Sequence, residues 1–180
     1  MSEILYHTKF LDLKTTPSKN GQPWIYAHRP NAKDVVVILT KHQDEILFII
    51  EERPPIQAEN RGEYAIGLVA GLVGDERIGE SIDNAIRAEL LEEAGLIASK
   101  IDIKVKNVAS SAGCVSETFT VAIAEVQSKT PVQEPISDDG VIIERVWIKK
   151  ENIHSWLKNK EEKGYVLTSQ ALAALFYLYE

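Results

Sequence analysis

Four glutamates in one short segment carry the most specific chemical signal in this sequence. The segment "GESIDNAIRAELLEEAGL" spans residues 79–96 and contains Glu80, Glu89, Glu92 and Glu93. If it is helical, the last three fall on one side, because residues three and four positions apart are neighbours on a helix. Like charges at this spacing destabilise a helix by about 0.2–0.5 kcal/mol per pair. The segment holds a single basic residue, Arg87, so something else must relieve the repulsion.

A bound divalent cation is the chemistry that this arrangement favours over a solvated acidic face. A solvated face normally carries Lys or Arg four residues from its glutamates, and the sequence places none there. The segment is entered from the glycine-rich stretch "AGLVGDERIG" and left through Gly95. Mg²⁺ takes oxygen ligands from one or two carboxylates and completes its shell with water and substrate phosphates. The spacing and its flanks together predict a site for magnesium and a diphosphate.

The stretch "GDERIGESIDNAIRAELLEEAGL" resembles the Nudix box, G-x5-E-x7-R-E-U-x-E-E-x-G-U, in which U is a bulky apolar residue. The matching positions are Gly74, Glu80, Glu89, Leu90, Glu92, Glu93, Gly95 and Leu96. The box arginine falls on Ala88, and Arg87 lies one residue earlier, about 100° around a helix. That arginine holds a metal-binding glutamate in place in the family. The resemblance therefore implies either reduced activity or another cation in this role. Three additional residues also lie between Gly71 and the "GE" pair of the box.

Other stretches resemble the ADP-ribose pyrophosphatase branch of this family. "WIYAHR" resembles a segment in which an aromatic ring stacks on adenine and an arginine holds phosphate or ribose, which implies these roles for Trp24 and Arg29. "ERPP" resembles the segment whose arginine contacts the diphosphate, which implies Arg53. "VAGLV" resembles a turn that offers a metal-binding carbonyl, here Ala70, and a substrate contact, here Leu72. Strand packing and a solvated turn are the plain structural alternatives for Trp24 and Arg53.

The loop "SSAGCVSE" resembles a branch segment whose glutamate is the proposed base, which implies this role for Glu117. The resemblance as a whole implies hydrolysis of ADP-ribose to AMP and ribose 5-phosphate, with Mg²⁺ as cofactor or Mn²⁺ in its place. The implied metal ligands are Ala70, Glu89, Glu92 and Glu93, and the implied catalytic residues are Glu92, Glu93 and Glu117. Asp138 and Asp139 lie where the branch often places a further acidic group, and otherwise they are turn residues.

Three other functions stay open at this point. The chain could hydrolyse another nucleotide sugar, such as GDP-mannose, or a smaller phosphorylated substrate, because a tryptophan stacks on any base. It could be a nucleotide sensor that binds without cleaving, which Ala88 and the additional residues before the box favour. It could also be an acidic structural domain, which would show no shift of melting temperature with Mg²⁺.

These residues need a sheet and a helix to bring them together. Strands are predicted over 4–13, 24–29, 34–40, 45–52, 63–72, 102–109, 117–126 and 141–148, and helices over 82–94, 151–163 and 168–179. Ser81 is the predicted N-cap of the first helix, with Gly95 just past its end. This order predicts an α+β fold, an α/β/α sandwich of the Nudix type with a mixed central sheet, flanking helices and a small N-terminal β segment. We divide the chain into residues 1–30, the dimer-forming β segment, and 31–180, the Nudix hydrolase domain.

The composition indicates which partners and which cellular compartment to expect. The 180 residues are 44% hydrophobic and carry a net charge of −7, which argues against nucleic acid as a partner. One cysteine, Cys114, permits no intrachain disulfide and indicates a reducing compartment, the cytoplasm. The sequence has no signal-like N-terminus and no apolar run of about 20 residues, so no membrane is expected. The expected partners are a small nucleoside-diphosphate substrate and a second copy of the chain. Branch members resemble one another in being homodimers whose N-terminal strands complete the partner's site, and "ILYHTKFLDL" fits this role or is equally an edge strand on its own subunit.

Overall fold

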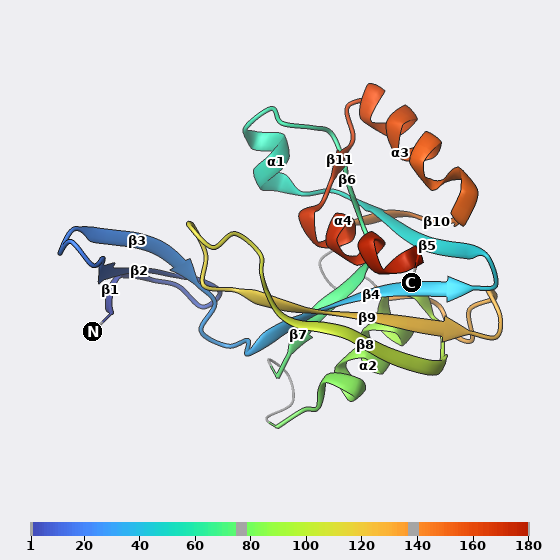
Figure 1. Cartoon of the computed structure of the whole chain (residues 1–180), viewed down its shortest axis with the longest axis horizontal. Helices are drawn as coiled ribbons and strands as arrows, with labels where there is room; N and C mark the ends of the chain where they lie inside the picture. Colours follow the sequence, from blue (N-terminus) through green and yellow to red (C-terminus); the bar gives the residue numbers. More distant parts are fainter. Residues whose placement is uncertain (1, 75–78, 137–140, 180) are drawn as a thin grey trace.

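A small three-stranded sheet projects from the main body of the protein. The computed structural model describes residues 2–74, 79–136 and 141–179. The projecting sheet consists of β1 (Glu3–His7), β2 (Asp12–Pro17) and β3 (Pro23–His28), paired antiparallel, and lies at the left of Figure 1. Its exposed large apolar side chains include Ile4, Leu5, Tyr6, Leu13, Trp24 and Ile25. A sheet this small needs a hydrophobic face that packs against another element to be stable.

The main sheet is mixed, as the sequence predicts. Its eight strands are β4 (Asp34–His42), β5 (Glu45–Glu51), β6 (Ala65–Gly67), β7 (Val69–Val73), β8 (Ala98–Ala109), β9 (Thr118–Val126), β10 (Ile142–Lys149) and β11 (Val166–Leu167). The order is β11-β6-β5-β4-β9-β8, with β10 beside β5 and β7 beside β4. The pairs β4–β9 and β6–β11 are parallel, and the other pairs are antiparallel. β4 is central because its apolar run, Val36–Leu39, is buried on both faces.

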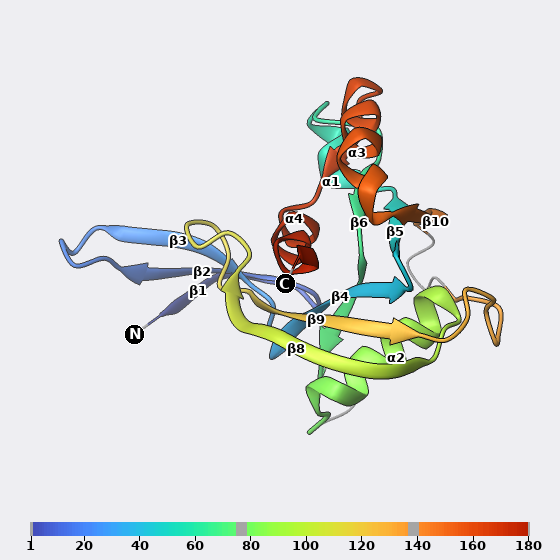
Figure 2. The ribbon, with the colours of Figure 1, turned by 45° about the vertical axis from the view of Figure 1, so that its right-hand side comes forward.

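Helices cover both faces of this sheet. They are α1 (Pro54–Ala58), α2 (Ile82–Ala94), α3 (Ile153–Glu162) and α4 (Ser169–Leu175), with short 3₁₀ turns η1 (Lys150–Asn152) and η2 (Phe176–Tyr179). Side chains of α2 belong to one core cluster, and side chains of α3 and α4 belong to a second one. Figure 2 shows α2 and α4 on opposite sides of β4. The predicted α/β/α sandwich is therefore confirmed.

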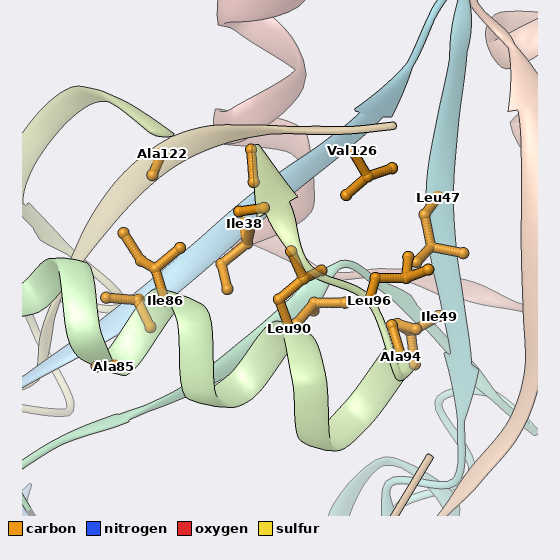
Figure 3. Packing of buried hydrophobic residues seen from close by; sticks show 14 of the residues in the cluster. Ile38, Leu47, Ile49, Ala85, Ile86, Leu90, Ala94, Leu96, Ala122 and Val126 are labelled. Carbon is orange, nitrogen blue, oxygen red and sulfur yellow. The ribbon is translucent and has the colours of Figure 1, made fainter. Parts of the chain in front are cut away.

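The helix α2 forms where the sequence predicts it. Its N-cap, its C-terminal glycine and its buried apolar residues all indicate the same helix. The Ser81 hydroxyl accepts a hydrogen bond from the Asn84 N–H at 3.2 Å, and Gly95 adopts a φ of 67°, which favours glycine. Ala85, Ile86, Leu90 and Ala94 are buried. Figure 3 shows Ile86 and Leu90 pointing from α2 into the cluster that contains Ile38 of β4. Since this face is fixed to the sheet, the orientation of the glutamates on α2 is fixed as well.

Several element boundaries differ from those that the sequence predicts. The strand expected over 4–13 is broken into β1 and β2, because the Thr8 hydroxyl accepts the Leu11 N–H at 2.8 Å and forms a turn. The polar stretch 53–63 contains the short helix α1, whose first residue is Pro54. β8 begins at Ala98, earlier than expected. The division at residue 30 stays a prediction. Among the described residues, no helix combines the length and hydropathy needed to cross a bilayer.

Candidate active site

The Glu89 side chain lies directly against β7, in a space that only glycine leaves open. A Cβ atom built on Gly71 would stand 1.8 Å from the carboxyl carbon of Glu89 and 1.8 Å from one of its oxygens. Two heavy atoms cannot share this space, so any side chain at position 71 would displace the carboxylate. The Glu89 carboxylate is therefore packed against the sheet.

Glu93, one helical turn further on, is fixed to the neighbouring residue of the same strand. The backbone N–H of Ala70 donates a hydrogen bond to Oε2 of Glu93 at 3.2 Å. Because residues i and i+4 share a helix face, both glutamates reach β7 from consecutive turns of α2. The structure thus brings together three residues with predicted metal-binding roles, Ala70, Glu89 and Glu93.

The environment of Glu93 disfavours its negative charge. Burial raises the pKa of Glu93 from its ordinary value of 4.5 to about 7. The Ala70 N–H, Arg53 and Arg145 act in the opposite direction, whereas the nearby carboxylate of Glu51 raises the pKa further. A positive charge within about 4–6 Å favours an ionised carboxylate. A partly dehydrated carboxylate next to further oxygen donors therefore fits a hard divalent cation.

Glu51 and Arg53 form an ion pair beside this site. Nη2 of Arg53 lies 2.8 Å from Oε2 of Glu51, and the Arg53 side chain is 55% exposed. Burial raises the pKa of Glu51, and the charge and hydrogen bond of Arg53 partly offset that effect. The guanidinium has five N–H donors, and this pair uses only part of them. Arg53 therefore lies at the edge of the site, with about half of its side chain open to solvent.

Arg29, just after β3, and Glu117, just before β9, form a second group, and Trp24 of β3 contacts another part of the loop that precedes β9. Nε of Arg29 lies 3.3 Å from Oε2 of Glu117, and the Ser110 hydroxyl donates to Oε1 of Glu117 at 3.0 Å. The indole N–H of Trp24 donates to the Gly113 carbonyl at 2.9 Å. Trp24 is 51% exposed, so its ring is accessible to a flat ligand.

A cavity of about 100 Å³ opens beside Arg29 and Glu117. Its lining residues are His28, Arg29, Ala32, Lys33, Asp34, Val35, Ser116, Glu117 and Thr118. Thr118 and Thr120 donate hydrogen bonds to the Asp34 carboxylate at 3.4 and 2.5 Å.

The two groups lie at different points along β4. Ala70, which contacts Glu93, is paired with Val37, whereas Thr118, next to Glu117, bonds to Asp34. Three residues of strand, about 10 Å, separate Asp34 from Val37. Within one chain the structure therefore places Glu117 with Arg29 and Ser110, and places Glu93 with Ala70.

The other predicted positions are only partly described. Glu92 is half-buried, and its backbone carbonyl accepts the Ile136 N–H at 2.7 Å. Leu72 is half-buried on β7, opposite Val35. Asp138, Asp139 and residues 75–78 before the box lie outside the described residues. Within 2–74, 79–136 and 141–179, no three or more His, Cys, Asp or Glu side chains converge closely enough to hold a metal ion.

Two further residues, Glu51 and Arg145, lie near the end of α2 and are not indicated by the sequence pattern. Glu51 acts on Glu93 through its charge, and Nε of Arg145 donates to the backbone carbonyl of Glu93. Glu51 stands two residues before Arg53 in "IEERPP", but the strand pattern does not say which carboxylate faces α2. Arg145 lies in "VIIERVWI", which reads as an ordinary strand with a solvated face. Neither contact leaves a local signal, because each depends on the tertiary fold.

Known proteins share both this sequence pattern and this fold. No family model matches the chain. Over 137 residues it is 26% identical to proteins named ADP-ribose pyrophosphatase from Escherichia coli strain K12, Escherichia coli O157:H7 and Shigella flexneri. The chain resembles the ADP-ribose pyrophosphatases. The aligned region covers 76% of this chain and 62% of each relative, so the chain spans less than two thirds of the length of the curated relatives it matches.

The fold of this chain also occurs in a solved structure. A crystal structure described as an ADP compounds hydrolase matches with a TM-score of 0.74, covering 99% of this chain and 90% of that one. The two sequences are 18% identical, so this match shows a shared fold. The predicted likeness to the ADP-ribose pyrophosphatase branch is thus confirmed, while the roles of individual residues stay predictions.

Proposed function

We propose that this chain hydrolyses ADP-ribose to AMP and ribose 5-phosphate, with Mg²⁺ or Mn²⁺ as its metal. The observation that carries the proposal is the placement of the Glu89 and Glu93 carboxylates against Gly71 and Ala70 of β7. The names of the relatives and of the structural neighbour support an ADP-linked diphosphate as substrate. An enzyme of phosphoryl transfer acts mainly by positioning the reactants and by stabilising the charge on the phosphoryl oxygens, and this site has groups for both tasks.

Four oxygen-bearing residues are assigned to hold the metal: Ala70 through its carbonyl, and Glu89, Glu92 and Glu93 through their carboxylates. The donor set is all oxygen, which suits Mg²⁺ and Mn²⁺. The raised pKa of Glu93 supports the assignment, because burial, its largest cause, disfavours the ionised carboxylate, and a bound cation would favour it. When bound, a divalent cation neutralises charge on the diphosphate and acidifies a water molecule.

Two arginines are assigned to the diphosphate. The planar fork of a guanidinium binds phosphate oxygens in pairs, which suits Arg53 and Arg29. Each arginine is paired with a glutamate here, Arg53 with Glu51 and Arg29 with Glu117. A phosphate that draws Arg29 away leaves Glu117 to accept the proton of the attacking water, which requires hydrogen-bond reach. The adenine stacks on the exposed ring of Trp24, and the half-buried Leu72 contacts the substrate beside the metal ligands.

We also propose a homodimer, in which the N-terminal sheet of one subunit completes the site of the other. The sheet projects from its own subunit and exposes apolar side chains (Figure 1). Asp34, which Thr118 contacts, and Val37, which pairs with Ala70, are about 10 Å apart along β4, so a second subunit offers a way to bring Trp24 and Arg29 to the metal ligands. Cys114 has an exposed thiol, which fits a reducing cytoplasm.

Product analysis with matched variants tests the proposed function. Wild-type protein, incubated with ADP-ribose and Mg²⁺, should release AMP and ribose 5-phosphate in equal amounts. Glu89→Gln and Glu93→Gln should each reduce the rate by about 100-fold, as the loss of a metal-site group does. Arg87→Gln, on the same helix but paired with Asp83, serves as the control that keeps its activity. Full turnover in both glutamine variants contradicts the assignment. Tight binding without product indicates a nucleotide sensor, and preferred cleavage of GDP-mannose indicates the other substrate class.

A further inference from the structure

The position that carries an arginine in the Nudix box is Ala88 in this chain, and its neighbour Arg87 does not replace that arginine. Nε of Arg87 lies 2.8 Å from Oδ2 of Asp83, one turn back on the exposed side of α2. Nη1 of Arg87 donates to the Ala98 carbonyl at 3.1 Å, at the start of β8. The Arg87 guanidinium is therefore directed at β8, away from the β7 side on which Glu89 and Glu93 lie.

The last turn of α2 is held by a series of hydrogen bonds to its carbonyl groups. The Leu90 carbonyl accepts the Leu96 N–H at 3.1 Å, and the Leu91 carbonyl accepts the Gly95 N–H at 2.9 Å. The next two carbonyls are bonded from outside the helix. That of Glu92 accepts the Ile136 N–H, and that of Glu93 accepts Nε–H of Arg145. The final carbonyls of a helix lack partners within it, so these contacts set where the last turn sits.

Arg145 brings a full positive charge to this helix end. A cation is favourable there, because the carbonyl groups at a helix C-terminus carry partial negative charge. Arg145 lies on β10, paired with Ile49 of β5, and β10 follows β5 from Glu45 to Glu51. The arginine therefore ties the end of α2 to the same strand pair that carries Glu51. Its contact with Glu93 joins residues 52 positions apart in the sequence.

We propose that Arg145 is a positioning residue that replaces the missing box arginine: it fixes the last turn of α2 so that the Glu89 and Glu93 carboxylates stay against β7. This inference rests on the proposed function, because it assigns the two glutamates to the metal. Arg145 acts through the backbone of Glu93 and not through the substrate. Loss of Arg145 should therefore lower kcat and metal affinity, while KM for ADP-ribose changes little.

The experiment compares Arg145→Gln, Arg145→Lys and Arg87→Gln with the wild type. Mn²⁺ binding is measured by calorimetry without substrate, and amide hydrogen exchange is measured over α2. Arg145→Gln should weaken Mn²⁺ binding by about 10-fold, the usual effect of losing a group that orients a ligand. It should also speed the exchange of the Gly95 and Leu96 amides, which report opening of the last turn. Arg145→Lys should recover most of the affinity by keeping the charge, and Arg87→Gln should match the wild type.

A second substitution tests whether Arg145 and the box position exchange roles. Ala88→Arg should raise Mn²⁺ affinity several-fold in the Arg145→Gln background and have less effect in the wild-type background, since the two arginines would do the same task. If Arg145→Gln does not fold, the variant that carries both Ala88→Arg and Arg145→Gln decides. Restored folding with Mn²⁺ binding in this double variant supports the inference, and an unfolded double variant overturns it.

The outcomes separate this inference from the proposed function. If Arg145→Gln matches Arg87→Gln in Mn²⁺ affinity and in exchange at Gly95 and Leu96, Arg145 has no positioning role, whatever the substrate. If the wild type binds Mn²⁺ but releases no AMP from ADP-ribose, the proposed function fails. The comparison of Mn²⁺ affinities still decides the role of Arg145 in that case.

Discussion

The backbone N–H of Ala70 donates a hydrogen bond to the Glu93 carboxylate at 3.2 Å, across 23 positions of sequence. This contact joins the last turn of α2 to the middle of β7. It makes Glu93 part of the interface between helix and sheet, together with Glu89, which fills the space above Gly71. Because the chemistry of the site depends on this interface, changes on either side of it should alter both activity and stability.

Replacing Gly71 by alanine should displace Glu89. The new methyl group would meet the Glu89 carboxyl at 1.8 Å, so the carboxylate or the helix must move. We expect about a 10-fold or larger loss of kcat with ADP-ribose, and a loss of only about 1 kcal/mol in the free energy of unfolding, because the methyl group meets the far end of a flexible side chain. Urea unfolding and steady-state kinetics measure the two effects. In a Glu89→Ala background the methyl group has room, so the destabilisation by Gly71→Ala should disappear. An equal destabilisation in both backgrounds would contradict the contact.

The stability of the metal-free protein should fall as pH rises toward neutrality. The pKa of Glu93 in the folded state, about 7, lies above its ordinary value of 4.5. Between these values the folded protein binds more protons than the unfolded chain, so the free energy of unfolding decreases with pH and levels off above pH 7. The decrease due to Glu93 should be about 2 kcal/mol, after a discount for its partial exposure.

Urea unfolding in EDTA across this pH range measures the effect. Glu93→Gln should reduce the slope, and a smaller slope should remain because burial also raises the pKa of Glu51. Saturating Mg²⁺ should reduce the slope in the wild type, since a cation favours the ionised carboxylate. A slope that is the same in wild type and Glu93→Gln would show that Glu93 is not the titrating group.

Trp24 should contribute to substrate binding through its ring. Stacking of a base on an aromatic side chain is worth about 1–3 kcal/mol, so Trp24→Ala should raise KM for ADP-ribose by about 10-fold or more, with little change in kcat. Trp24→Phe keeps an aromatic face but loses the indole bond to Gly113, and it should recover most of the binding. An unchanged KM in Trp24→Ala would mean that the tryptophan only fixes the loop before β9.

The exposed N-terminal sheet should form a dimer interface. Sedimentation or light scattering should give twice the 20.1 kDa mass of one chain. Ile25→Lys, at a residue that is 55% exposed, should shift the protein toward monomer and lower activity together. Lys14→Ala, on the neighbouring strand β2, removes no apolar cover and serves as the control. A monomeric wild type with full activity would contradict the dimer.

The parts of the fold that follow from local sequence could be predicted, and the long-range contacts could not. The helix α2 has a matching cap, a C-terminal glycine and a buried stripe of Ile86 and Leu90, so its position could be predicted within a residue. The short helix α1 was missed because "RPP" reads as a turn, although proline is favoured at a helix start.

In the candidate site too, local spacing could be predicted and long-range contacts could not. The four-residue spacing of Glu89 and Glu93 is enough by itself to place them on one helix face. That this face meets Gly71, and that Glu51 and Arg145 stand beside it, depends on how α2, β5 and β10 pack. The sequence pattern shows that the box arginine is absent at Ala88, but only the fold shows which arginine lies near the helix end.

Glu89 and Glu93 are proposed to hold a divalent cation against β7. The most direct measurement is an anomalous difference map from a crystal that contains Mn²⁺ and a non-hydrolysable ADP-ribose analogue. We expect a Mn²⁺ peak in contact with the carboxylates of Glu89 and Glu93, with a diphosphate oxygen of the analogue as a further ligand. A bound analogue with no Mn²⁺ at these two carboxylates would contradict it.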